Sequence, residues 1–109
     1  MQDLTQKKCT PCEGGTEPMK SEEVATYCKL VSGWDVRDGK AIAKTFSFAD
    51  FSEALAFVNH VGEIAESEGH HPDIRLFDYK NVEIVLSTHA IGGLSVNDFI
   101  VASKIDALR

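Results

Sequence analysis

The sequence predicts an α+β fold in which a four-stranded antiparallel sheet carries helices on one face. Three observations lead to this prediction: two pairs of strand-like segments each surround a turn, three segments show helical spacing of apolar residues, and the element order is α-β-β-α-β-β-α. Strands joined by tight turns pair antiparallel, and helices that alternate with hairpins pack over the sheet that the hairpins share. The chain of 109 residues has the length of one domain.

The first twenty residues are polar and contain proline and glycine, so we expect an extended arm rather than core. The single domain then covers 21–109. Ser21 is placed to cap the first helix and Gly33 to end it. Apolar residues recur along this segment with the spacing of one helix face, namely at Val24, Tyr27, Cys28 and Val31.

The first hairpin is expected to consist of strands at 34–36 and 40–48, joined by the turn Arg-Asp-Gly. The longest helix follows it. Asp50 and Glu53 have the spacing of a capping pair at its start, and Gly69 suits its end. The residues that begin with His70 therefore lie just beyond a helix C-terminus.

The second hairpin is expected at 74–79 and 82–88, with Lys80 and Asn81 in its turn. Alternate residues of its second strand, Val82, Ile84 and Leu86, share one buried face, and the same parity directs His89 away from them. The spacing of Ser95 and Asp98 predicts a capped final helix that extends to about Leu108, with Phe99, Ile100 and Ser103 turned inward.

Charge and hydropathy exclude several classes of protein. The net charge is −6 and the lysines are scattered, which argues against direct binding of nucleic acid. The apolar runs are too short to span a bilayer, and the first residues have no apolar stretch typical of a secretory signal. A cytoplasmic protein without a membrane partner is the expectation.

The cysteines indicate little chemistry. Cys9 and Cys12 have C-x-x-C spacing, but the sequence contains no second pair to complete a zinc site, and no strand precedes them as in a thioredoxin-like motif. We expect this pair to be incidental or to order the N-terminal segment. Cys28 is expected to be a small buried apolar residue.

Three of the four histidines fall in one part of the chain, at His70, His71 and His89. Imidazole is the side chain that both donates and accepts protons near neutral pH, because its unperturbed pKa is about 6.5. Two adjacent imidazoles after a helix, with a third brought back by a hairpin, indicate proton transfer on a bound ligand. His60 lies outside this group and is expected to be an ordinary helix residue.

The motifs around these histidines resemble those of the pterin-4a-carbinolamine dehydratases. They are E-x3-H-H-P from Glu66, the aromatic Tyr79, S-T-H ending at His89, and G-L-S-x-x-D ending at Asp98. The resemblance covers roughly 21–108 and includes Gly-Trp at 33–34 and F-x-F-x-D-F at 46–51. The C-x-P-C-x-G-G of the arm is similar to that of bacterial members.

The resemblance implies that a 4a-hydroxytetrahydropterin loses water to give the quinonoid dihydropterin, without a metal or cofactor. It implies His70 and His89 as acid and base, and His71 as a substrate-binding residue that shares in catalysis. It also implies substrate-binding roles for three residues elsewhere in the motifs, namely Glu66, Trp34 and Asp98. A homodimer or homotetramer is expected, with a functional link to an aromatic amino acid hydroxylase.

Two departures from the family pattern and two alternatives remain. Gly69 stands where many animal members have an acid, so Glu66 or Glu68 would have to supply that function. Ile91 stands where some members have a cysteine. The alternatives are a metal-binding protein that uses the same histidines, and a non-catalytic binding or regulatory module, because animal members also act as dimerisation cofactors for a homeodomain transcription factor.

Overall fold

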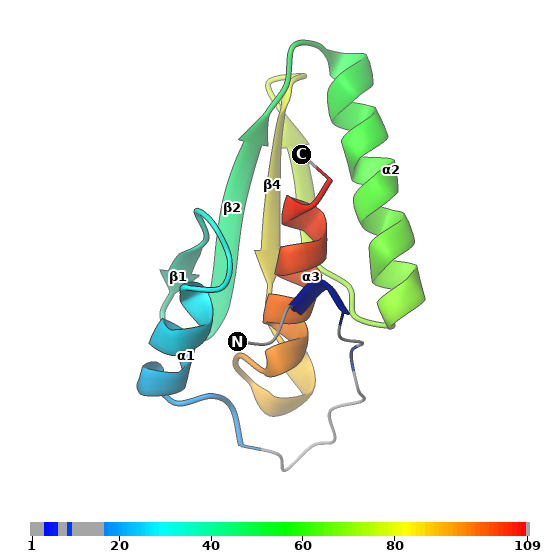
Figure 1. Ribbon diagram of the computed structural model, residues 1–109. Helices are drawn as coiled ribbons and strands as arrows, with labels where there is room; N and C mark the ends of the chain where they lie inside the picture. Colours follow the sequence, from blue (N-terminus) through cyan, green and yellow to red (C-terminus); the bar gives the residue numbers. More distant parts are fainter. Residues whose placement is uncertain (1–3, 7–8, 10–16, 109) are drawn as a thin grey trace.

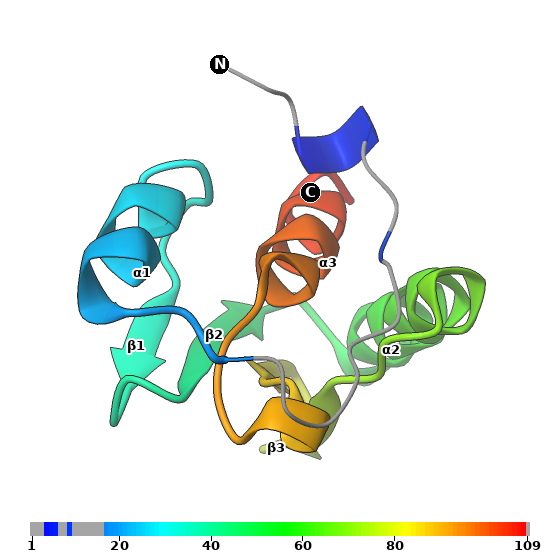
Figure 2. The same cartoon turned by 90° about the horizontal axis from the view of Figure 1, so that it is seen from below.

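The computed structural model describes residues 4–6, 9 and 17–108. Within these residues one antiparallel sheet has the strand order β1-β2-β4-β3, and the helices gather over one of its faces (Figures 1 and 2). The predicted α+β class and element order are confirmed. The elements are η1 (Leu4–Gln6), α1 (Ser21–Cys28), β1 (Asp35–Arg37), β2 (Ala41–Ser47), α2 (Phe51–Glu68), β3 (Asp73–Phe77), β4 (Asn81–Leu86), η2 (His89–Ile91) and α3 (Val96–Asp106).

The predicted alternation along β4 is confirmed. Val82, Ile84 and Leu86 are fully buried, and Ile84 pairs with Ile74 of β3. On the other side β4 pairs with β2, where Ile42 lies opposite Leu86. The buried face of this central strand packs against the helices in the core. The chain that follows the strand lies at the end of the sheet where the histidines are found.

Both predicted ends of α2 are confirmed. The Asp50 carboxylate accepts a hydrogen bond of 2.8 Å from the Glu53 backbone N–H. Gly69 has φ +65°, in the left-handed region that glycine adopts without strain. The backbone N–H of His70 then donates to the Ala65 carbonyl, at 3.2 Å. The chain therefore leaves α2 in a sharp turn, and His70 is fixed to the last turn of the helix.

The first helix is shorter than predicted. It ends at Cys28 instead of Gly33, and Lys20, not Ser21, occupies the N-cap position. The loop after Cys28 leaves the helical path because Asp106 accepts from the Ser32 N–H at 3.2 Å, while Lys44 Nζ donates to the Ser32 carbonyl at 2.6 Å. Val31 packs against the core from this loop, so its position on the expected helix face was wrong.

The hairpin turns lie slightly away from their predicted positions. Asp38 and Gly39 have φ of +52° and +68°, and Asp78 and Tyr79 have φ of +48° and +54°. Two consecutive left-handed residues match the right-handed twist of the strands that they join. Tyr79 is therefore an exposed turn residue rather than the end of a strand.

Part of the N-terminal segment belongs to the core, contrary to the expectation of an arm outside it. Leu4 is buried against α3, and the Met19 N–H donates to the Leu94 carbonyl at 2.8 Å. A methyl group on Gly93 would lie 2.7 Å from Cβ of Pro18, so only glycine allows this close approach. Cys12 lies outside the described residues.

The last helix is buried on more than the predicted face. It lies between α1 and α2 with η1 beside it, as Figure 2 shows. Phe99, Ile100 and Ser103 are buried as predicted, but Asp98 and Ile105 are fully buried too. A helix enclosed on three sides needs no polar face, which explains why its amphipathic pattern is weak. Among the described helices, none combines the length and apolar character needed to cross a bilayer.

Candidate active site

A cavity of about 520 Å³ opens where α2, β4, η2 and the start of α3 meet. All three histidines that the sequence singled out line it, and Cys9, Glu68 and Asn97 line it as well. His60 is exposed on α2 and is not among the lining residues. The structure therefore brings together imidazoles from two separate segments of the chain.

His70 is held in place by a buried carboxylate. Its Nε2 lies 2.6 Å from Asp98 Oδ1, and its side chain is only 12 % exposed. An ionised carboxylate only accepts hydrogen bonds, so the proton of the neutral imidazole is on Nε2. The lone pair is then on Nδ1, and this nitrogen is the one able to take a proton from a ligand.

Asp98 itself is completely buried. The sequence motifs had implied that this side chain contacts the substrate directly. Its second oxygen accepts from the Thr88 hydroxyl at 2.8 Å and from the Ser95 N–H at 3.0 Å. The latter bond closes the predicted cap of α3. These donors fix the carboxylate, and the carboxylate fixes His70. Asp98 is thus a positioning residue.

His71 has a different environment from its neighbour. Its Nε2 lies 2.6 Å from Glu66 Oε1, but both side chains are well exposed, at 60 % and 80 %. Exposed pairs of this kind contribute little to stability. The Glu66 carboxylate is not among the residues that line the cavity. Glu66 is thus the partner of His71, and the acidic partner that the structure gives to His70 is Asp98.

His89 begins the 3-10 turn η2, which the sequence did not predict. Thr88 bridges to Gly93, and Gly92 has φ +67°, so this turn is tightly closed. His89 is exposed and lies at the cavity, away from the buried row of β4, as its parity predicted. Because Thr88 also donates to Asp98, the supports of His70 and His89 share one residue.

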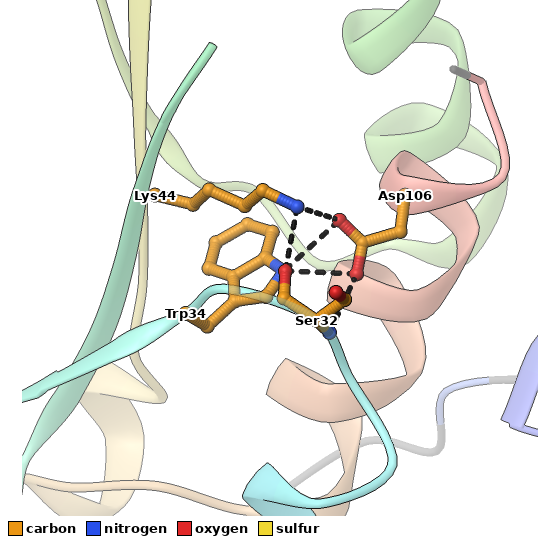
Figure 3. A network of polar contacts seen from close by, with 4 residues as sticks. All are labelled: Ser32, Trp34, Lys44 and Asp106. Carbon is orange, nitrogen blue, oxygen red and sulfur yellow. Dashed lines mark hydrogen bonds and ion pairs between the residues drawn. The ribbon is translucent and has the colours of Figure 1, made fainter.

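Trp34 is not brought to this cavity. It lies in a second polar network beside α3, drawn in Figure 3. Its indole N–H donates to the Asp106 carboxylate at 3.1 Å, and Lys44 Nζ lies 2.8 Å from the same carboxylate. The ring is buried and packs edge-on against Phe46. We therefore leave Trp34 out of the proposed site.

Cys9, Glu68 and Lys104 are the residues near the cavity that the sequence gave no reason to expect together. The Cys9 N–H donates to Glu68 Oε1 at 2.8 Å, and Lys104 Nζ lies 2.6 Å from Glu68 Oε2. Burial, followed by the negative charge of Glu68, raises the pKa of the Cys9 thiol to about 12. The thiol is thus neutral near pH 7. Cys9 and Glu68 are 59 positions apart in the sequence, so no local pattern indicates this contact.

Among the residues described, no three histidine, cysteine, aspartate or glutamate side chains are grouped as metal ligands would be. The three imidazoles line the same cavity without forming such a group.

Comparison with known proteins decides the family. The model of the pterin 4 alpha carbinolamine dehydratase family matches residues 17–108. The chain belongs to the pterin-4a-carbinolamine dehydratase family. A relative from Rubrobacter xylanophilus is 45 % identical over 99 % of this chain and 100 % of its own length, and one from Nitrosomonas europaea is 48 % identical over 97 % and 93 %. Both carry the name of pterin-4-alpha-carbinolamine dehydratase as a provisional assignment.

Solved structures agree with this family. A crystal structure from Brucella melitensis, described as a transcriptional coactivator/pterin dehydratase, has a TM-score of 0.76 and 31 % identity, and covers 84 % of this chain and 98 % of its own. A pterin dehydratase-like protein described as a RuBisCO assembly factor of the alpha-carboxysome has a TM-score of 0.59 over 70 % of this chain. At 24 % identity, the second likeness concerns the fold alone. The family and the names of these relatives support a dehydratase acting on a pterin carbinolamine.

Proposed function

We propose that the chain dehydrates a 4a-hydroxytetrahydropterin to the quinonoid dihydropterin, with His70, His71 and His89 as the catalytic residues. One observation carries the proposal: three imidazoles from two segments line the same cavity. The volume of about 520 Å³ lies in the usual range for small-molecule sites. Membership of the family makes the pterin the expected ligand.

The reaction needs two proton transfers and no change of oxidation state. Carbon 4a carries a hydroxyl group and a ring nitrogen, and the lone pair of that nitrogen expels the hydroxyl. The C–O bond breaks as an acid protonates the leaving oxygen, and a base removes the proton from the nitrogen. Each positioned acid or base contributes about 10²–10⁴-fold to such a reaction.

The supports of the histidines suggest how these tasks are divided. His70 Nε2 lies 2.6 Å from Asp98. With the ionised carboxylate as acceptor, Nε2 carries the proton, Nδ1 is the basic nitrogen, and the carboxylate stabilises the imidazolium that forms. We assign His70 as the base and His89, from the segment that follows β4, as the acid. His71 is exposed and held by Glu66, which suits ligand binding with a smaller share in catalysis.

The test is the decay of a 4a-hydroxytetrahydropterin, generated in place and followed by its absorbance, with the uncatalysed rate subtracted. His70→Ala and His89→Ala should each lower kcat by about 10²-fold or more, whereas His71→Ala should mainly raise KM. His60→Ala is the matched control, because this exposed α2 histidine lies outside the cavity lining. Wild-type protein that does not exceed the blank would favour a non-catalytic module. Loss of activity on chelation would favour a metal site.

We further propose that the chain works as a homodimer or homotetramer and receives its substrate from an aromatic amino acid hydroxylase, whose reaction leaves a hydroxyl on carbon 4a. Large apolar side chains stand exposed on two elements, at Phe51 and Leu55 of α2 and at Ile74 of β3. Such side chains favour an interface. Light scattering of the purified chain measures the assembly, and a monomer at micromolar concentration would contradict it.

A further inference from the structure

Among the described residues of the N-terminal segment, Cys9 lines the histidine cavity. It lines the cavity although it lies about sixty positions before His70 in the chain. Its backbone N–H donates to Glu68 Oε1 at 2.8 Å, and its Sγ lies 3.6 Å from the Asn97 carbonyl oxygen. Cys9 is therefore seated between the last turn of α2 and the first turn of α3, the elements that position His70 and Asp98.

The acceptor of this contact is itself held by an ion pair. Lys104 Nζ lies 2.6 Å from Glu68 Oε2, and the exposed fractions of the two side chains are 19 % and 6 %. One oxygen of Glu68 thus binds α3 and the other binds the N-terminal segment. A carboxylate that binds an ammonium group with one oxygen and a backbone N–H with the other is held in one position between these two elements.

We propose that Cys9, held by Glu68 and Lys104, is a specificity-determining wall of the cavity against which the pterin ring packs. This inference rests on the proposed function, since it takes the pterin as the ligand. The wall is apolar in character. A protonated thiol is a small, polarisable surface that suits contact with a flat ring, and burial and Glu68 together raise the pKa of this thiol to about 12. It therefore does not act as a nucleophile at neutral pH.

Kinetics separate a wall from a catalytic group. Cys9→Leu, which fills part of the cavity, should raise KM about tenfold with kcat nearly unchanged, because it opposes substrate and transition state equally. Cys9→Ser keeps the size and should change KM less than about threefold. Glu68→Gln keeps an oxygen for the Cys9 N–H but loses the charge that binds Lys104, so KM should rise about three- to tenfold. Glu63→Gln, on the exposed side of the same helix, is the matched control.

Thiol reactivity tests the seating of Cys9 without turnover. In the Cys12→Ser/Cys28→Ser background Cys9 is the remaining cysteine, and a chromogenic disulfide reagent applied at alkaline pH, where a fraction of the thiol is ionised, reports its modification rate. The rate should fall severalfold when a dihydropterin saturates the protein, and it should rise severalfold in Glu68→Gln. Cys9 modification that is unaffected by bound dihydropterin would overturn the wall, as would an unchanged rate in Glu68→Gln.

The two proposals fail in different ways. Wild-type protein with neither dehydration activity nor affinity for dihydropterin would overturn the proposed function, and with it the contact between Cys9 and the ring. An active enzyme in which Cys9→Leu has the KM of the wild type would overturn the wall alone. A variant that unfolds is recognised by its melting temperature, and the thiol rates in the folded background then decide.

Discussion

A carboxylate lies near each end of α3, and the two carboxylates hold the chain together in similar ways with different consequences. Asp98 accepts from His70, Thr88 and the Ser95 N–H. At the other end, Asp106 binds three groups of its own: the Ser32 N–H, the Trp34 indole and the Lys44 ammonium. Each carboxylate fastens segments distant in sequence onto the central helix.

The difference lies in what each carboxylate holds. The partner of Asp98 is an imidazole that lines the cavity, while the charged partner of Asp106 is a lysine outside that cavity. An imidazole changes its protonation near pH 7, and a lysine does not. We therefore expect the same substitution at the two positions to affect activity at one end of the helix and stability at the other.

The largest expected effect is that of Asp98→Asn. The amide keeps the size of the carboxylate but presents an NH₂ group to His70, which reverses the tautomer and removes the lone pair from Nδ1. The catalysed rate should fall about 10²–10³-fold, by analogy with the loss of an orienting carboxylate in other histidine systems. The measurement is kcat after subtraction of the uncatalysed rate.

The melting temperature of Asp98→Asn serves as its control, because a folded variant separates loss of the tautomer from loss of the fold. A folded Asp98→Asn protein with more than half of the wild-type kcat would show that Asp98 only supports the structure. The contrast between the two ends of α3 would then disappear.

Asp106→Asn should show the opposite behaviour. It removes the charge that binds Lys44 and weakens three hydrogen bonds at a partly buried position, so the free energy of unfolding should fall by about 1–3 kcal/mol. The catalysed rate at a temperature where the variant is folded should stay within twofold. Urea unfolding measures the first quantity. A tenfold loss of kcat in the folded variant would instead connect this network to the cavity.

Thr88→Val sharpens the comparison, because it leaves both carboxylates in place. It removes the hydroxyl that donates to Asp98 Oδ2 at 2.8 Å while it keeps the shape of the side chain. We expect kcat to fall up to about tenfold as Asp98 and His70 lose one restraint, which corresponds to about 1.4 kcal/mol. A pH profile of kcat shows whether the change acts through His70. A profile unchanged in shape, with kcat equal to wild type, would remove Thr88 from the positioning network.

Much of the fold followed from local patterns in the sequence. The caps of α2 at Asp50 and Gly69 and the alternation of Val82, Ile84 and Leu86 are read correctly because neighbouring residues decide them. That His70 and His89 line one cavity also followed, since the C-terminal ends of α2 and β4 lie at the same end of the sheet.

The errors arose where contacts between residues far apart in the sequence determine the local structure. The length of α1 depends on the contacts that Ser32 makes with Asp106, 74 positions away. The burial of Leu4 and the seating of Cys9 depend on α2 and α3, which no pattern within the arm indicates. Asp98 was expected to touch a ligand, because its motif gives its position in the chain but not its complete burial.

The smallest effect in the comparison is expected for Trp34→Phe, and it also tests the binding role that the sequence motifs implied for this residue. Phenylalanine retains the packing against Phe46 but has no N–H to donate to Asp106. The Asp106 carboxylate keeps its contacts with Lys44 and Ser32. The loss of one hydrogen bond should lower the free energy of unfolding by about 1 kcal/mol, with KM and kcat unchanged. Urea unfolding and the dehydration assay measure both quantities. A tenfold rise in KM without loss of stability would place Trp34 at a pterin site. Because Trp34 does not line the cavity of its own chain, a neighbouring copy of the chain would then have to bring it there.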